Sequence, residues 1–200
     1  DVGVVTKTES DLSDIEVGYL TAMYDQLNPT SIEGTTADDI LNGTTGIDDI
    51  STGLGSDVVY ALAGNDTITL TADAVWSSGY VARNVDNSTA VGTNETITLE
   101  GLNTFSDVID GGDDIDTLIL TEGSDAFFID DVYSDHHSSL TLSSTTQGID
   151  STARMIDLET INAGEGNDIV DLTSDNFVLT NGVTINGEAG NDNLWGSNGN

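Results

Sequence analysis

The chain has 200 residues, of which 36 are Asp or Glu and three are Lys or Arg, so its formal net charge is −33. Nucleic-acid binding and docking on anionic lipid both need a basic surface, so this composition excludes both classes. The chain has no Cys, which excludes disulfides and thiolate zinc sites. It also has no apolar run near the ~20 residues of a membrane span.

Residues 1–33 are expected to form an N-terminal cap or linker. Within them, apolar side chains such as Tyr19 and Met23 fall near one helical face over residues 10–27. This pattern predicts a short N-terminal helix that covers an open end of the fold. A strand over 15–20 is the alternative.

A nine-residue repeat begins at Gly34 and runs without a gap through 34–42, 43–51, 52–60 and 61–69. In each unit the sixth residue is Asp and the eighth is aliphatic. Positions one to six predict a Gly-rich turn, and positions seven to nine predict a short strand with its middle side chain inward. One unit cannot bury that side chain alone. The repeat therefore predicts a mainly β fold, a parallel β-solenoid or β-roll in which the units stack.

Related units recur after position 100, but the phase between the groups of units is broken. The Asn181-Gly182 pair predicts a β-hairpin, although two further solenoid rungs are the alternative. We therefore assign the solenoid to 34–69, 102–119, 163–171 and 187–200, and we expect two large excursions at 70–101 and 120–162 and a shorter one at 172–186.

The sixth-position Asp residues are expected to stack on those of the unit two further on, so that Asp39 pairs with Asp57 and Asp48 with Asp66. Stacked carboxylates repel each other, and a hard cation with flexible oxygen coordination removes the repulsion, so several Ca²⁺ ions are the predicted cofactors. Acids near Asp116 form either a further calcium site or a solvated loop. The candidate metal ligands are Asp39, Asp48, Asp57, Asp66, Asp107, Asp110, Asp114, Asp116, Asp168 and Asp192.

The repeat resembles the calcium-binding G-G-x-G-x-D-x-U-x nonapeptide of RTX proteins. Residues 106–139 and 156–177 also resemble a peptide-binding domain in the distal part of giant RTX adhesins of Gram-negative bacteria. The resemblance implies type I secretion, folding on external calcium, display at the cell surface and capture of exposed peptide C-termini. It also implies that the chain is a single ligand-binding domain, monomeric within a much longer protein.

The excursions contain the candidate ligand-binding residues, because long insertions in a regular scaffold often carry function. An Arg side chain can bind a ligand carboxylate in bidentate fashion, or it can form a structural salt bridge with the acidic solenoid. Aromatic side chains, including Trp76, can line a groove or form a small core, and acidic ones can hold a calcium ion that faces the ligand. The candidates are Tyr80, Arg83, Asp130, Asp131, Tyr133, Asp135 and Arg154.

The sequence thus predicts an extracellular, calcium-dependent ligand-binding module of an adhesin. A structural RTX spacer and a glycan-binding module are the alternatives. The chain contains no H-E-x-x-H, G-x-S-x-G or P-loop motif, so we do not expect an enzyme.

Overall fold

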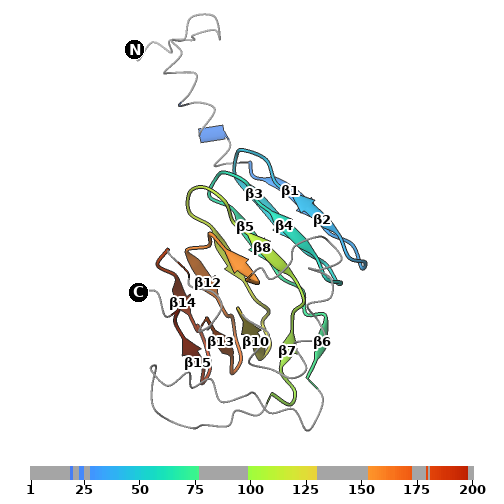
Figure 1. Ribbon diagram of the computed structural model, residues 1–200, viewed down its shortest axis with the longest axis vertical. Helices are drawn as coiled ribbons and strands as arrows, with labels where there is room; N and C mark the ends of the chain where they lie inside the picture. Colours follow the sequence, from blue (N-terminus) through green and yellow to red (C-terminus); the bar gives the residue numbers. More distant parts are fainter. Residues whose placement is uncertain are drawn as a thin grey trace, which may run out of the picture.

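The computed structural model describes residues 28–76, 99–129, 153–172, 179 and 181–197, together with Tyr19, Met23 and Tyr24. These residues form short strands joined by tight turns (Figure 1). The strands are β1 (Thr30–Glu33), β2 (Ile40–Asn42), β3 (Asp48–Ser51), β4 (Val58–Tyr60), β5 (Thr67–Thr69), β6 (Ala74–Val75), β7 (Asn103–Thr104), β8 (Val108–Asp110), β9 (Thr117–Ile119), β10 (Asp125–Phe128), β11 (Met155–Ile156), β12 (Thr160–Asn162), β13 (Ile169–Asp171), β14 (Thr184–Asn186) and β15 (Asn193–Trp195).

The strands form three walls. The first wall has the order β1-β3-β5-β9-β12-β14, the second β11-β8-β4-β2, and the third β15-β13-β10-β7-β6. Neighbours within a wall pair in parallel, except that β6 pairs antiparallel with β7. Because consecutive strands other than β6 and β7 lie in different walls, the chain winds as a solenoid, and the predicted mainly β, parallel architecture is confirmed.

The number of walls changes along the solenoid axis. Strands β2 to β5 alternate between the first and second walls, whereas β14 and β15 belong to the first and third. Between them, β8, β9 and β10 lie in three different walls, and β11, β12 and β13 repeat that circuit one layer further on. The middle of the molecule is therefore a three-walled section between two two-walled ends, as Figure 1 shows.

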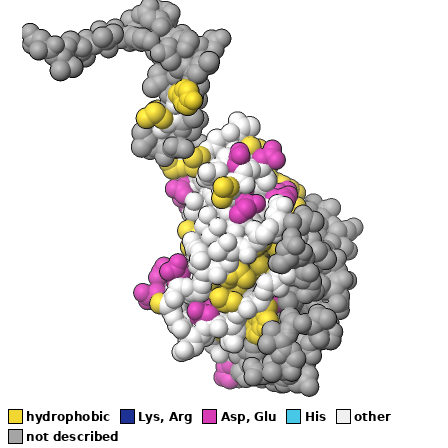
Figure 2. All heavy atoms as spheres, turned by 90° about the vertical axis from the view of Figure 1, so that its left-hand side faces the viewer, with side chains coloured by type: hydrophobic (Ala, Val, Ile, Leu, Met, Phe, Trp, Pro, Cys, Tyr) yellow, Lys and Arg dark blue, Asp and Glu magenta, His cyan; other side chains and the backbone are white. Residues whose placement is uncertain are grey.

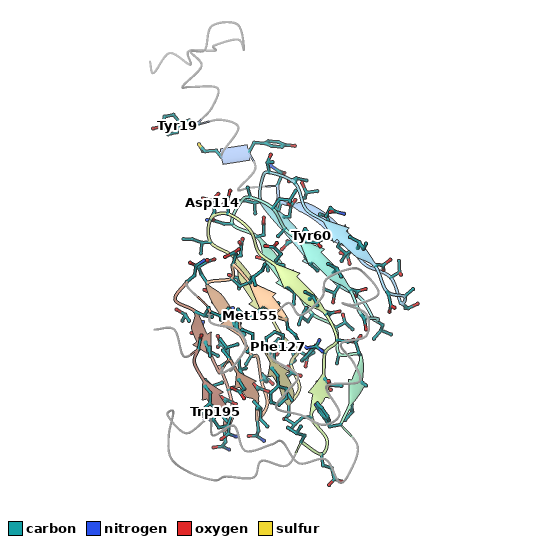
Figure 3. All side chains as sticks on the ribbon, viewed as in Figure 1. Tyr19, Tyr60, Asp114, Phe127, Met155 and Trp195 are labelled. Atoms are coloured by element: carbon teal, nitrogen blue, oxygen red, sulfur yellow. The ribbon has the colours of Figure 1, made fainter. Side chains whose placement is uncertain are left out.

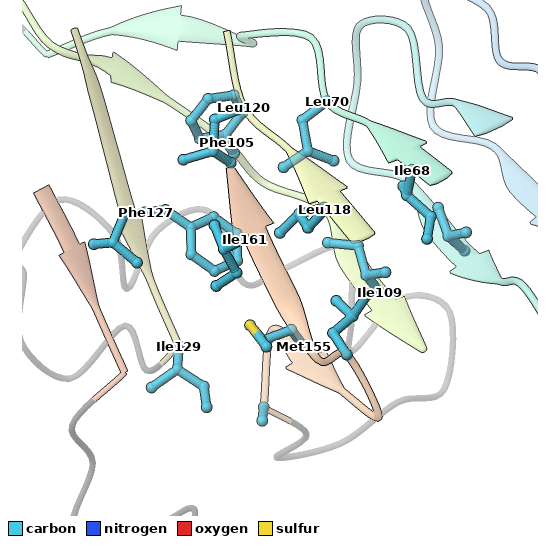
Figure 4. Packing of buried hydrophobic residues seen from close by; sticks show 14 of the residues in the cluster. Ile68, Leu70, Phe105, Ile109, Leu118, Leu120, Phe127, Ile129, Met155 and Ile161 are labelled. Carbon is cyan, nitrogen blue, oxygen red and sulfur yellow. The ribbon is translucent and has the colours of Figure 1, made fainter. Parts of the chain in front are cut away.

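The core contains the eighth-position side chains, which stack in register within each wall. In the first wall Ile68, Leu118 and Ile161 are aligned, and each is 0% exposed. The three-walled section also encloses two aromatic rings, Phe105 and Phe127, with centroids 6.4 Å apart and planes at 57° (Figure 4). Such tilted aromatic pairs are favourable in a core, and the third wall provides the room for them.

The second expected excursion, at 120–162, is shorter than predicted. The unit 120–128 continues the phase of 111–119, and its strand β10 pairs with β13 in the third wall. Strands β11 and β12 likewise return residues 155–162 to the solenoid. Assigning all of 120–162 to an excursion was therefore wrong. The unit 120–128 is hard to recognise in the sequence because Leu120 stands where the repeat usually has Gly or another small residue.

The third excursion contains a solenoid strand instead of a hairpin. Strand β14 pairs in parallel with β12, with Ile185 opposite Ile161. The Asn181-Gly182 turn therefore does not fold β14 back on an antiparallel neighbour. The alternative reading as solenoid rungs holds for this strand.

A second hydrophobic cluster lies at the third wall. It contains Trp76, Leu99, Ala126, Phe128 and neighbouring apolar side chains, with Trp195 packed against it. Trp76 is only 1% exposed, so of the two alternatives, a groove or a small core, the core holds for this side chain. Figure 3 shows Trp195 near the C-terminal end of this wall.

The predicted N-terminal helix over 10–27 falls almost wholly outside the described residues. Two of its capping-face side chains, Tyr19 and Met23, are described and are 70% and 57% exposed. Among the described residues no helix is long and apolar enough to cross a membrane.

Candidate metal site

The turns between strands stack closely, and in several of them glycine at the fourth position permits the close approach. Gly55, Gly64 and Gly166 have φ values of 125°, 134° and 132°, a region that other residues rarely adopt. A Cβ on Gly64 would also lie 2.5 Å from the carbonyl oxygen of Gly46 in the turn beneath. The Gly-rich pattern therefore lets successive turns approach with their carboxylates aligned.

The sixth-position side chains form three columns, one beside each wall. We name each column after the wall whose strands follow its turns. The first column contains Asp48, Asp66, Asp116 and Glu159; the second contains Asp39, Asp57 and Asp107; the third contains Asp125, Asp168 and Asp192.

Within each column, one carboxylate oxygen of an Asp accepts a hydrogen bond from the backbone amide of the preceding Asp in that column. The Asp48 amide donates to Asp66 at 2.8 Å, and the Asp39 amide donates to Asp57 at 2.8 Å. Equivalent bonds join Asp57 to Asp107, Asp66 to Asp116, Asp125 to Asp168 and Asp168 to Asp192, at 2.8 to 3.1 Å. The predicted stacking of Asp39 with Asp57 and of Asp48 with Asp66 is therefore confirmed.

The second carboxylate oxygen is left without a hydrogen bond in four of these residues. Oδ2 of Asp57, Asp66, Asp116 and Asp168 is buried and has no hydrogen-bond partner. Burial raises the pKa of Asp116 to about 7 and the pKa values of the other three to about 6, although the accepted amide bond opposes the shift. A buried carboxylate oxygen without a donor is costly, so these positions favour a cation.

These residues fit calcium. Carboxylate oxygens and backbone carbonyls are its preferred ligands, and its coordination tolerates irregular geometry. Among the described residues, no group of three or more acidic or histidine side chains gathers at one point. A calcium ion at an unpaired Oδ2 would therefore need backbone carbonyls of the turns as further ligands.

Three carboxylates, at the start of the three columns, are instead hydrogen-bonded by residues of their own turn. Asp39, Asp48 and Asp125 accept hydrogen bonds from the amide and hydroxyl of the Thr four residues earlier. These hydrogen bonds lower the pKa of Asp39. Asp125 was not among the predicted site residues, although the unbroken phase from 111–119 and Gly123 at position four indicated it.

The second column ends at a buried arginine. In the register of β8 and β11, Ala153 stands opposite Asp107, so the next carboxylate is missing. Arg154 follows directly, is 3% exposed, and donates from one guanidinium nitrogen to the carbonyl oxygens of Phe105 and Asp107. It also opposes the rise that burial and the charge of Asp73 cause in the pKa of Asp107. The side chain is therefore buried in the solenoid and bonded to its backbone carbonyls, which favours the structural role over the predicted ligand-binding one.

The remaining predicted metal residues, Asp110 and Asp114, line a polar pocket of about 530 Å³. Asp157 and Glu159 lie on the same pocket, and Asp114 is labelled on its turn in Figure 3. Burial raises the pKa of Asp110, and the charge of Asp157 adds to the shift. The pocket therefore concentrates negative charge beside the first column.

The sequence predicted six further ligand-binding residues. Tyr80, Arg83, Asp130, Asp131, Tyr133 and Asp135 all lie outside the described residues.

The comparisons with known proteins agree with the columns. Residues 33–68, 103–128, 159–176 and 183–200 match the family of the RTX calcium-binding nonapeptide repeat, in four copies. The chain thus carries the calcium-binding repeats of the RTX family, and its cofactor is calcium, with several ions per set of repeats. No curated protein and no solved structure matches the chain.

Proposed function

We propose that this chain is a calcium-dependent ligand-binding module of a secreted RTX adhesin at a bacterial cell surface, and that it binds exposed peptide C-termini. RTX repeat proteins are typically secreted, and calcium outside the cell would then drive folding. The binding residues would lie in the insertions 77–98 and 130–152, carried on the calcium solenoid.

The observation that supports the proposal is that both insertions leave the solenoid beside the third wall. The first is flanked by Trp76 and Leu99, which are buried in the second hydrophobic cluster. The second runs between Ile129 and Ala153, and the backbone amide of the next residue, Arg154, donates to the carbonyl oxygen of Ile129 at 3.1 Å. Phe128 belongs to the same cluster as Trp76, so both insertions leave the solenoid at neighbouring points. A spacer needs no such arrangement, whereas a binding site built from two loops does.

The test is a screen of immobilised peptides and glycans with the full chain, in calcium and in chelator. We expect calcium-dependent binding of peptides with a free C-terminal carboxylate, and loss of binding when the carboxylate is amidated. Replacing 77–98 or 130–152 by a short Gly-Ser linker should abolish binding while the calcium-induced β-sheet circular dichroism signal remains.

Arg83→Gln should weaken peptide binding at least tenfold, because Arg pairs with a carboxylate in bidentate fashion. Lys7→Gln is the matched control, since it removes an equal charge outside both the solenoid and the insertions. If the chain bound only glycans in this screen, the proposed peptide ligand would be wrong and a glycan would take its place. If no peptide or glycan bound in a calcium-dependent manner, the binding proposal would be contradicted and the structural spacer would be the remaining function.

A further inference from the structure

Seven of the turns that carry a column carboxylate fall into two kinds, which differ at their second residue. In the turns 34–39, 43–48 and 120–125 the second residue is Thr35, Thr44 or Thr121. In the turns 52–57, 61–66, 111–116 and 163–168 it has φ between 82° and 92°, and it is Gly53, Leu62, Gly112 or Gly164. We call these threonine-closed and open turns.

In a threonine-closed turn, the Thr forms the same set of hydrogen bonds each time. In the turn 43–48, the Thr44 amide donates to Oδ2 of Asp48 at 2.6 Å, and the hydroxyl donates to the same carboxylate at 3.1 Å. The hydroxyl also accepts the Gly46 amide at 3.1 Å. Thr35 and Thr121 repeat this geometry, and the Gly123 amide donates to the Thr121 hydroxyl at 3.0 Å. The carboxylate is therefore satisfied by its own turn.

The open turns lack this closure, and they are the four turns with a buried Oδ2 that has no hydrogen bond. Asp57, Asp66, Asp116 and Asp168 each leave that atom unpaired. The two sets share no member. In these seven turns, whether the carboxylate is satisfied therefore follows from the residue at position two.

The positions of the two kinds of turn are also ordered. Asp48, Asp39 and Asp125, the residues of the threonine-closed turns, are the first carboxylates of the first, second and third columns, respectively. Every open turn lies further along its column. We infer that each column begins with a threonine-closed turn whose Asp is not a calcium ligand, and that calcium is held from the open turns.

This inference rests on the calcium-dependent folding of the chain, and it assigns ions to some repeats and not to others. A first turn has no carboxylate-bearing turn beneath it to share a cation, so an internal hydroxyl replaces the ion. The predicted ligands Asp39 and Asp48 would then have a structural role that needs no metal.

The test compares two isosteric variants of the full chain within one column, Asp48→Asn and Asp66→Asn. The number of bound calcium ions is measured by isothermal titration calorimetry and by elemental analysis after dialysis. We expect Asp66→Asn to lose at least one ion and Asp48→Asn to lose none. Loss of an ion from Asp48→Asn would overturn the inference alone. Retention of every ion by Asp66→Asn would instead contradict the calcium columns themselves.

A second pair of variants tests the closure without removing a carboxylate. Thr44→Val removes the hydroxyl that bonds to Asp48, whereas Thr45→Val alters the adjacent exposed residue, for which no hydrogen bond is described. We expect Thr44→Val to raise the calcium concentration at the folding midpoint at least twofold, because ion binding must replace the lost stabilisation. Thr45→Val should leave the midpoint unchanged. Equal midpoints for the two variants would contradict the role of the hydroxyl.

Discussion

At the residue scale, Asp107 shows how a carboxylate can be buried without a further carboxylate above it. Ala153 leaves the next place in the column without an acid, and the guanidinium of Arg154 lies at the carbonyl oxygens of the Asp107 turn. Arg154 is the one Lys or Arg within the described part of the chain. The guanidinium of Arg154 supplies a positive charge beside Asp107 from within the chain. This end of the second column therefore does not depend on an external ion for its charge balance.

Arg154→Met should therefore destabilise the folded chain. Removing one charge from a buried, opposite-charge environment costs on the order of 3 kcal/mol, because the remaining charge stays desolvated. Urea denaturation in saturating calcium measures the change. Arg154→Lys, which keeps the charge but loses the planar donor group, should lose less. A Met variant as stable as the native chain would contradict the neutralising role of Arg154.

At the scale of the element, a single repeat unit can contribute an inward side chain to the core from its strand and a carboxylate to a column from its turn. The unit 111–119 is an example, since Leu118 is 0% exposed between Ile68 and Ile161 while Asp116 lies in the first column. Hydrophobic stacking and ion binding therefore act on the same short segment. Loss of either is expected to weaken the other.

Leu118→Ala should cost about 3 kcal/mol, because it removes buried methyl groups and leaves a cavity between the layers. Ile115→Ala is the matched control in the same unit, since Ile115 is 60% exposed and its truncation should change stability by less than about 0.5 kcal/mol. Both values come from urea denaturation in saturating calcium. Similar losses of stability in the two variants would show that the stacked aliphatic side chains do not form the stabilising core.

At the scale of the whole molecule, the net charge of −33 opposes compaction. Figure 2 shows acidic side chains in several groups on one face, with no basic side chain among the described residues there. Further acids are buried in the columns, where each calcium ion adds two positive charges. Calcium therefore neutralises the buried carboxylates, whose desolvation would otherwise oppose folding.

Removing calcium should consequently unfold most of the chain at pH 8, measured as loss of the β-sheet circular dichroism signal in chelator. The raised pKa values of Asp57, Asp66 and Asp168, about 6, and of Asp116, about 7, set the pH dependence. Between their usual value near 4 and these values the calcium-free folded state binds more protons than the unfolded state, so its stability falls as pH rises.

In chelator, the β-sheet signal should therefore be stronger at pH 5 than at pH 8. Calcium affinity should change in the opposite sense and fall on acidification, because protons compete for the same oxygens. The same titration on Asp116→Asn is the control, since this variant should lose the component near pH 7. A chain that stays fully folded in chelator at pH 8 would refute the calcium columns.

The sequence by itself determined the repeating part of this protein, because each property there follows from local spacing. Position eight indicated which side chains are buried, position six indicated the stacked acids, and the fourth-position glycines indicated tight turns, as Ile68, Asp66 and Gly64 show within one unit. Parallel pairing of units two apart followed from the uninterrupted run 34–69.

Only the tertiary structure decided how the interrupted units come together. The pairing of β10 with β13, the third wall and the placement of Ala153 opposite Asp107 depend on which strands meet after insertions of unequal length, and spacing cannot specify that. The separation of threonine-closed from open turns also required the structure. Asp48 and Asp66 have the same position in their repeats, but only their hydrogen bonds show that one is satisfied by its own turn and the other is not.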